Sequence, residues 1–155
     1  MFNLSSTPLT GPVKMALILD DDLTAREALR HTLDTLGYQT QVASDVDVAL
    51  DVLRASADTI ALFFDVEAYE ATLDGRDYVS LIGSLLEDRT LAHKHIFAVI
   101  SSTPEDVEWT LGKALARLNI TILRKPCAAP TIEAYLAMAR GQLASDRLPQ
   151  IASTY

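Results

Sequence analysis

The sequence predicts an α/β fold in which helices cover both faces of one five-stranded parallel sheet. Short apolar runs rich in β-branched residues alternate five times with longer segments of helical periodicity. Neighbouring parallel strands need crossover connections, which helices supply and which are right-handed. Because 155 residues are a usual length for one domain, we expect a single domain and no second folded module.

The first strand is predicted at residues 15–19, where the apolar run MALIL stops at three aspartates. A helix follows, because Thr24 and Glu27 have the spacing of a capping box and apolar residues then recur every three or four positions. Gly37 marks the end of this helix.

The second and third strands have different patterns. Residues 38–43 alternate polar and apolar side chains, which indicates a strand near a sheet edge. Ser44 and Asp47 then form a second capping box at the start of a helix. Residues 59–64 are apolar almost throughout, which is typical of a strand covered on both faces. A third helix carries its apolar residues within 78–86.

The last two strands are predicted at the apolar runs of residues 96–101 and 120–123. Thr103 and Pro104 start the helix between them, as a capping residue followed by proline in the first helical position. Pro130 opens the last helix. The most economical arrangement of five such units is a doubly wound, flavodoxin-like sheet with strand order 2-1-3-4-5. Its ligand crevice lies at the carboxyl ends of strands 1 and 3.

Composition narrows the classes of function. Thirteen Lys and Arg residues against twenty-one Asp and Glu residues give a net charge of −8. This charge repels phosphate backbones and anionic lipids, so we expect neither nucleic-acid nor membrane binding. A single cysteine and the lack of a signal or membrane-spanning segment favour a cytoplasmic protein. We expect flexible tails at 1–13 and 144–155 around a folded domain at 14–143.

Polar residues follow four of the predicted strands at one edge of the sheet. They are Asp20, Asp21 and Asp22 after the first strand, Asp65 after the third, Ser101 after the fourth and Lys125 after the fifth. Several carboxylates at one crevice repel one another, and a hard divalent cation such as Mg²⁺, or Mn²⁺, relieves that repulsion. A lysine and a hydroxyl beside the cation would bind a phosphoryl group. The combination predicts phosphoryl transfer onto an aspartate.

Four segments, in order, match the motifs of a known family. They are ILDDDLTAREAL, FFD ending at Asp65, AVIS ending at Ser101, and ILRKP ending at Pro126. Each is a weak signal alone, and the four together are a strong one. Over roughly residues 14–143 the chain resembles the receiver domain of bacterial two-component response regulators, of the chemotaxis-regulator type.

The resemblance implies a role for each matching residue. Asp65 would accept a phosphoryl group from a sensor histidine kinase or a histidine phosphotransfer protein. Asp20 and Asp21 would hold Mg²⁺ together with Asp65, Asp21 directly and Asp20 largely through water. Glu67 would add its backbone carbonyl to the metal. Receivers of this kind promote their own phosphorylation and dephosphorylation and are not dedicated enzymes.

The resemblance also covers the fourth and fifth strand ends. Ser101 matches the switch hydroxyl, and Lys125 matches the lysine that pairs with the phosphoryl group. The bond between Lys125 and Pro126 is a candidate cis peptide, as is frequent in the family.

An output surface is implied on the fourth helix, the fifth strand and the fifth helix. Its candidate residues are Trp109, Ile122, Tyr135 and Met138. Ile122 stands where many family members carry an aromatic switch residue, so a rotating aromatic ring is not expected here. We expect a stand-alone receiver that signals through a downstream protein partner or a homodimer.

Two alternatives stay open at this stage. A haloacid-dehalogenase-type phosphatase would use Asp20 as nucleophile and Asp22 as acid, although Leu23 stands where that motif usually has glycine. An interaction-only pseudo-receiver would keep the fold and signal by binding without turnover.

Histidine and cysteine carry no predicted chemistry. The histidines show no metal-ligand spacing and are interpreted as surface residues: His31, His93 and His95. Cys127 is interpreted as a buried, inert thiol.

Overall fold

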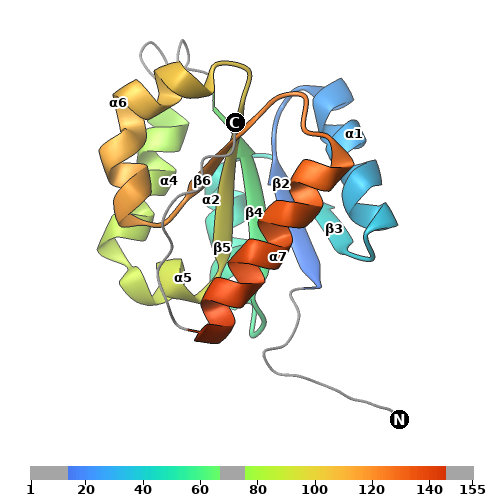
Figure 1. Ribbon diagram of the computed structural model, residues 1–155. Coiled ribbons are helices and arrows are strands. Elements are labelled where there is room, and N and C mark those ends of the chain that lie inside the picture. The colour runs from blue at the N-terminus through green and yellow to red at the C-terminus, as the bar shows by residue number, and fades with distance from the viewer. Residues whose placement is uncertain (1–13, 67–75, 146–155) are drawn as a thin grey trace.

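The computed structural model describes residues 14–66 and 76–145, and it contains one parallel five-stranded sheet (Figure 1). The strands lie in the order β3-β2-β4-β5-β6, which is 2-1-3-4-5 in chain order, so the predicted topology is confirmed. Each neighbouring pair is parallel. The strands are β2 (Met15–Leu19), β3 (Gln39–Val42), β4 (Ile60–Asp65), β5 (Ile96–Ser101) and β6 (Thr121–Arg124).

Helices cover both faces of the sheet. One face carries α1 and α7, and the other carries α2, α4 and α6 (Figure 1). The helices of the described part are α1 (Leu23–Thr35), α2 (Val46–Ala55), α4 (Arg76–Glu87), α5 (Arg89–Lys94), α6 (Pro104–Arg117) and α7 (Ala129–Ser145).

Two hydrophobic cores, one on each face, hold these layers together. Because side chains of a strand alternate between faces, Leu17 and Leu19 pack with α2, α4 and α6. Ala16 and Ile18 pack with α1 and α7. Strands β4 and β5 are buried at every residue, as their continuously apolar runs predict. Strand β3 at the sheet edge alternates exposed and half-buried residues.

Two helix starts differ from the predicted capping boxes. The carboxylate of Asp22 caps α1 by accepting the N–H groups of Thr24 and Ala25. Asp45 caps α2 in the same way, one residue after the predicted Ser44. Aspartate is a stronger N-cap than threonine, which accounts for α1. Aspartate and serine are about equally strong, so at α2 the extended backbone at Asp45 decides the position of the cap.

The amino-terminal edge of the sheet holds an unexpected histidine. The sequence predicts a surface position for His95, but the residue is 3% exposed. Its Nδ1 accepts the N–H of Ile60 at 2.9 Å, and its Nε2 donates to the carbonyl of Leu53 at 2.9 Å. The ring is therefore neutral, and it joins the end of α2 to the starts of β4 and β5. The preceding helix α5 has six residues, too few to be predicted from periodicity.

The predicted domain limits lie at the borders of the described residues. The tails expected at 1–13 and 144–155 fall outside these residues, except that α7 continues to Ser145. Within residues 14–66 and 76–145, no helix has the length and apolar character needed to cross a membrane.

Candidate functional site

The site lies at the carboxyl ends of β2, β4, β5 and β6. Asp65, the last residue of β4, is in register with Ile100 of β5. Beyond the strand, the N–H of Val66 donates to the carbonyl of Ile100 at 2.9 Å. The N–H of Lys125 donates to the carbonyl of Ser101 at 2.8 Å. These two bonds extend the sheet ladder past the strand ends and fix three predicted site residues at one edge.

Three carboxylates form the centre of the site. Asp20, Asp21 and Asp65 each offer an oxygen, and these oxygens lie within 4.8 Å of one another. Asp20 is 7% exposed and Asp65 is 5% exposed, whereas Asp21 faces solvent. Burial of charged carboxylates is unfavourable unless positive charge or hydrogen bonds compensate them. The cluster therefore requires cationic partners.

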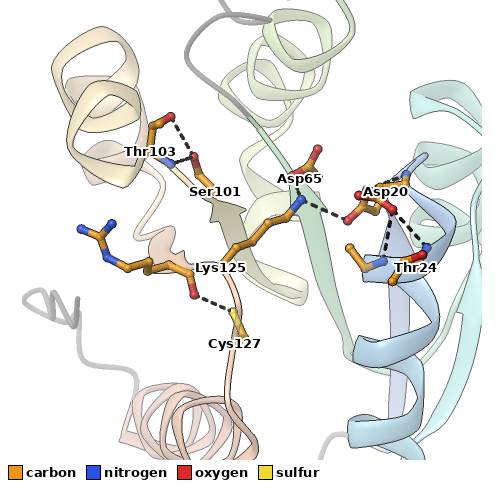
Figure 2. Close-up of polar contacts among 10 residues, drawn as sticks. Asp20, Thr24, Asp65, Ser101, Thr103, Lys125 and Cys127 are labelled. Atoms are coloured by element: carbon orange, nitrogen blue, oxygen red, sulfur yellow. Dashed lines mark hydrogen bonds and ion pairs between the residues drawn. The ribbon is translucent and has the colours of Figure 1, made fainter.

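Lys125 supplies one positive charge. Its Nζ lies 2.5 Å from Asp65 Oδ1 and 3.6 Å from Asp20 Oδ2. Figure 2 shows the lysine side chain extending from the end of β6 toward both aspartates. The structure thus brings Asp20, Asp65 and Lys125 together as the sequence predicts, and it gives the lysine two acidic partners at once.

The aspartates after β2 make different hydrogen bonds. Asp20 Oδ1 accepts the N–H of Asp22 at 2.9 Å. The Asp22 carboxylate accepts the N–H of Thr24 at 3.0 Å and that of Ala25 at 3.3 Å. Asp22 thus serves as the cap of α1, and Asp20 is held in place by the same loop. This arrangement favours the receiver interpretation over the phosphatase one, which needs Asp22 as an acid.

The donor set fits a magnesium ion. Oxygen ligands suit Mg²⁺. One carboxylate oxygen from each of Asp20, Asp21 and Asp65 lies within 4.8 Å of the other two, so these three residues would hold the ion. Asp20 also accepts a backbone N–H and lies near Lys125. Glu67, the predicted carbonyl ligand, lies outside the described residues.

Ser101 lies at the same edge and organises the start of α6. Its side chain is completely buried. The hydroxyl oxygen accepts the N–H of Thr103 at 2.9 Å and lies 3.4 Å from Thr103 Oγ1 (Figure 2). Just after the neighbouring strand β6, the peptide bond between Lys125 and Pro126 is cis.

Known structures share this arrangement of elements. The CheY-like response regulator receiver domain from Methylobacillus flagellatus superposes with a TM-score of 0.60 at 24% identity, covering 81% of this chain and 98% of that one. The signal receiver domain of an HD domain-containing protein from Pseudomonas fluorescens Pf-5 gives a TM-score of 0.68 at 18% identity, covering 92% and 97%. Chemotaxis response regulator CheY4 of Vibrio cholerae gives 0.60 at 17% identity, covering 81% and 98%.

The chain has the receiver-domain fold. No protein-family model matches the sequence, and no curated protein does. The likeness is therefore one of structure, and the site must be interpreted from its own residues.

The expected output surface of this receiver fold needs correction at two of its four residues. Ile122 and Tyr135 are buried, because both side chains pack into the cores. The Tyr135 hydroxyl donates to the carbonyl of Phe97 at 2.8 Å, and burial raises its pKa. Met138 is partly buried. Trp109 is 91% exposed and is the member of the set available to a partner.

A pocket of about 250 Å³ adjoins the acid cluster on the side of α1 and α2. It contains Arg26, which the sequence pattern does not single out because an arginine in the first turn of a helix is common. The pocket is lined by Leu19, Asp20, Asp21, Arg26, Ala43, Ser44, Asp45 and Val46.

Proposed function

We propose that this chain is a phosphoacceptor receiver in which Asp65 takes a phosphoryl group in a Mg²⁺-dependent phosphorelay. The supporting observation is the contact of Lys125 Nζ with Asp65 Oδ1 at 2.5 Å, inside a cluster of three carboxylates. The donor would be a sensor histidine kinase or a histidine phosphotransfer protein, as the receiver fold suggests.

The chemistry consists of positioning and charge compensation. An Asp65 carboxylate oxygen attacks phosphorus, the bond from phosphorus to the donor nitrogen breaks, and an acyl phosphate forms on the aspartate. Lys125, which contacts Asp65, would neutralise the phosphoryl oxygens, and Ser101 would offer a hydroxyl at the adjacent strand end. A bound magnesium ion, held by Asp21 and Asp65 with Asp20 through water, would supply further positive charge. These contributions lower the barrier by preorganised electrostatics.

The output is a change in protein contacts. Residues 14–143 form the proposed receiver, and the surface around Trp109 would contact a downstream protein or a second copy of the chain. The acidic composition and a single cysteine fit a role in the cytoplasm, without nucleic-acid or membrane binding.

Intact-mass analysis after incubation with acetyl phosphate and Mg²⁺ tests the proposal. We expect the wild-type protein to gain the mass of one phosphoryl group and Asp65→Asn to gain none. EDTA should abolish the adduct. Asp51→Asn is the matched control, because Asp51 is an exposed carboxylate on α2 away from the site, and it should be phosphorylated at the wild-type rate.

The modified residue separates the three candidate functions. Borohydride reduces an acyl phosphate and leaves homoserine, which peptide mapping locates. Homoserine at Asp65 supports the receiver, and homoserine at Asp20 would show the phosphatase nucleophile instead. No adduct, either from acetyl phosphate or from phosphorylated histidine kinase, would leave an interaction-only pseudo-receiver.

A further inference from the structure

An ion pair joins the first turn of α6 to the end of β6, next to the candidate site. The guanidinium group of Arg124, the last residue of β6, donates to the carboxylate of Glu105. Glu105 lies in the first turn of α6, directly after Pro104. The Arg124 side chain is 46% exposed and the Glu105 side chain is 65% exposed, so the pair adds little to the stability of the fold. A contact of this strength breaks and forms easily.

The ion pair closes a ring of contacts around Ser101. Ser101 is in register with Arg124, and its carbonyl accepts the N–H of Lys125 at 2.8 Å. The Ser101 hydroxyl oxygen accepts the N–H of Thr103 at 2.9 Å. Thr103 is the N-cap residue of α6, and Glu105 follows two residues later. The segment from Ser101 to Glu105 is therefore connected to β6 at both of its ends.

The Ser101 hydroxyl is turned away from the acid cluster in this arrangement. Figure 2 shows it directed toward Thr103, on the side of Ser101 away from Asp65. The proposed function needs the hydroxyl beside a phosphoryl group on Asp65. An N–H group that loses its acceptor is unfavourable, so we expect the segment from Ser101 to Glu105 to move together with the hydroxyl. Such a movement pulls Glu105 away from Arg124.

We propose that the ion pair between Glu105 and Arg124 is a latch that holds the segment in its resting arrangement and opens when the Ser101 hydroxyl turns to the phosphoryl group. The inference rests on the proposed function, because a phosphoryl group on Asp65 is what attracts the hydroxyl. Glu105 and Arg124 are positioning residues, since they act through Ser101. Opening the latch costs the free energy of the ion pair, so the latch lowers the affinity of the site for a phosphoryl group.

This affinity is the quantity that reports the latch. A protein whose binding-competent state is only partly populated binds its ligand with an affinity reduced by that fraction. Loss of the ion pair should therefore raise the affinity for a phosphoryl analogue about two- to fivefold, the range set by an exposed ion pair. Salt screens exposed charges, so the difference between variant and wild type should disappear in about 1 M KCl.

Titration with beryllofluoride, a phosphoryl analogue, in the presence of Mg²⁺ gives the first test. Calorimetry on the full chain measures the dissociation constant. Glu105→Gln and Arg124→Gln should each bind about two- to fivefold more tightly than the wild type. Asp106→Asn is the matched control, because it removes the same charge from the next residue of the first turn of α6, and it should bind like the wild type.

The same titration separates the two proposals. If the wild type does not bind beryllofluoride, the proposed function fails and the latch fails with it. If the wild type binds while Glu105→Gln and Arg124→Gln bind no more tightly, the latch alone is overturned.

A double-mutant cycle gives the second test. The variant that combines Glu105→Gln with Arg124→Gln should bind no more tightly than either single variant, because both changes break one contact. Arg124→Lys keeps the positive charge and should retain the wild-type affinity. Additive effects of the two substitutions, or a difference from the wild type that persists in about 1 M KCl, would overturn the proposal.

Discussion

Lys125 Nζ lies 2.5 Å from Asp65 Oδ1, although Asp65 ends β4, Lys125 follows β6, and these two strands are not neighbours. Strand β5 lies between β4 and β6, so the lysine side chain reaches across its carboxyl end. The ion pair compensates a carboxylate that is only 5% exposed. Because the same ammonium group also approaches Asp20, it competes with any cation that enters the cluster.

Replacement of Lys125 by methionine should separate the two effects of its charge, which are compensation of Asp65 and competition with a bound cation. Lys125→Met keeps a long side chain and removes the charge, so formation of the acyl phosphate should slow by about 100-fold. Affinity for Mg²⁺ should rise, because the competing ammonium group is gone. Time-resolved intact-mass analysis measures the rate, and Lys14→Met, at an exposed lysine, is the control. A wild-type rate in Lys125→Met would show that the lysine has no part in the reaction.

Magnesium should stabilise the folded protein. A ligand that binds only the native state adds about 2.7 kcal/mol to the free energy of unfolding at a concentration 100 times its dissociation constant. Thermal unfolding with MgCl₂ or with EDTA measures this increase. Asp21→Asn should remove most of it, and because Asp21 is exposed the variant should fold normally. Asp51→Asn should respond to Mg²⁺ like the wild type, and an equal response from Asp21→Asn would place the ion elsewhere.

Acidification should destabilise the protein through His95. Burial lowers the pKa of the imidazole, and nearby Lys94 lowers it further, while the Leu53 carbonyl raises it in part. Because the folded-state pKa lies below the unfolded one, the unfolded chain binds the extra proton. Stability is then lost as pH falls below about 6.5, by at most about 1.4 kcal/mol per pH unit.

Urea unfolding at pH 7.5 and pH 5.5 measures this loss. His95→Gln should be less stable at pH 7.5 but should show a smaller difference between the two pH values. His93→Gln, at an exposed histidine, should keep the wild-type difference. If His95→Gln kept it too, another group would be the source of the pH dependence.

Cys127 should react slowly with alkylating agents. Burial raises the pKa of its thiol to about 11, although the charge of Lys125 acts in the opposite direction. The thiol also donates to the carbonyl of Arg124 at 3.2 Å. A pKa two units above the usual value leaves about a hundredfold less thiolate at neutral pH. Iodoacetamide should therefore alkylate Cys127 much more slowly than it alkylates the thiol of glutathione, as measured by mass spectrometry. In urea, where the protein is unfolded, the rate for Cys127 should approach that of glutathione.

The fold could be predicted because its signals are local. Continuously apolar runs identified β4 and β5, and the alternating run before Ser44 identified an edge strand. Helix starts were less certain, because Asp22 stands beside Thr24 and Asp45 beside Ser44, and only the backbone conformation decides between competing caps.

The sequence could predict at which edge of the sheet the site lies, but not the contacts between its residues. The sequence places Asp65 and Lys125 after strands that end together, but their contact depends on strand register and on the twist of the sheet. Burial was the least predictable property. His95 and Tyr135 are polar at one end, and both are buried because specific backbone groups satisfy them: Ile60 N–H and the Leu53 carbonyl for His95, and the Phe97 carbonyl for Tyr135. No pattern in the sequence predicts these hydrogen bonds to the backbone.

The loop of three aspartates links cation binding to the first turn of a helix. Asp22 donates its N–H to Asp20, and its carboxylate accepts the amide N–H groups of Thr24 and Ala25. Any ligand that steadies Asp20 therefore also restrains the opening of these two amides to solvent. Hydrogen-deuterium exchange at Thr24 and Ala25 becomes a local readout of site occupancy that needs neither phosphate nor partner.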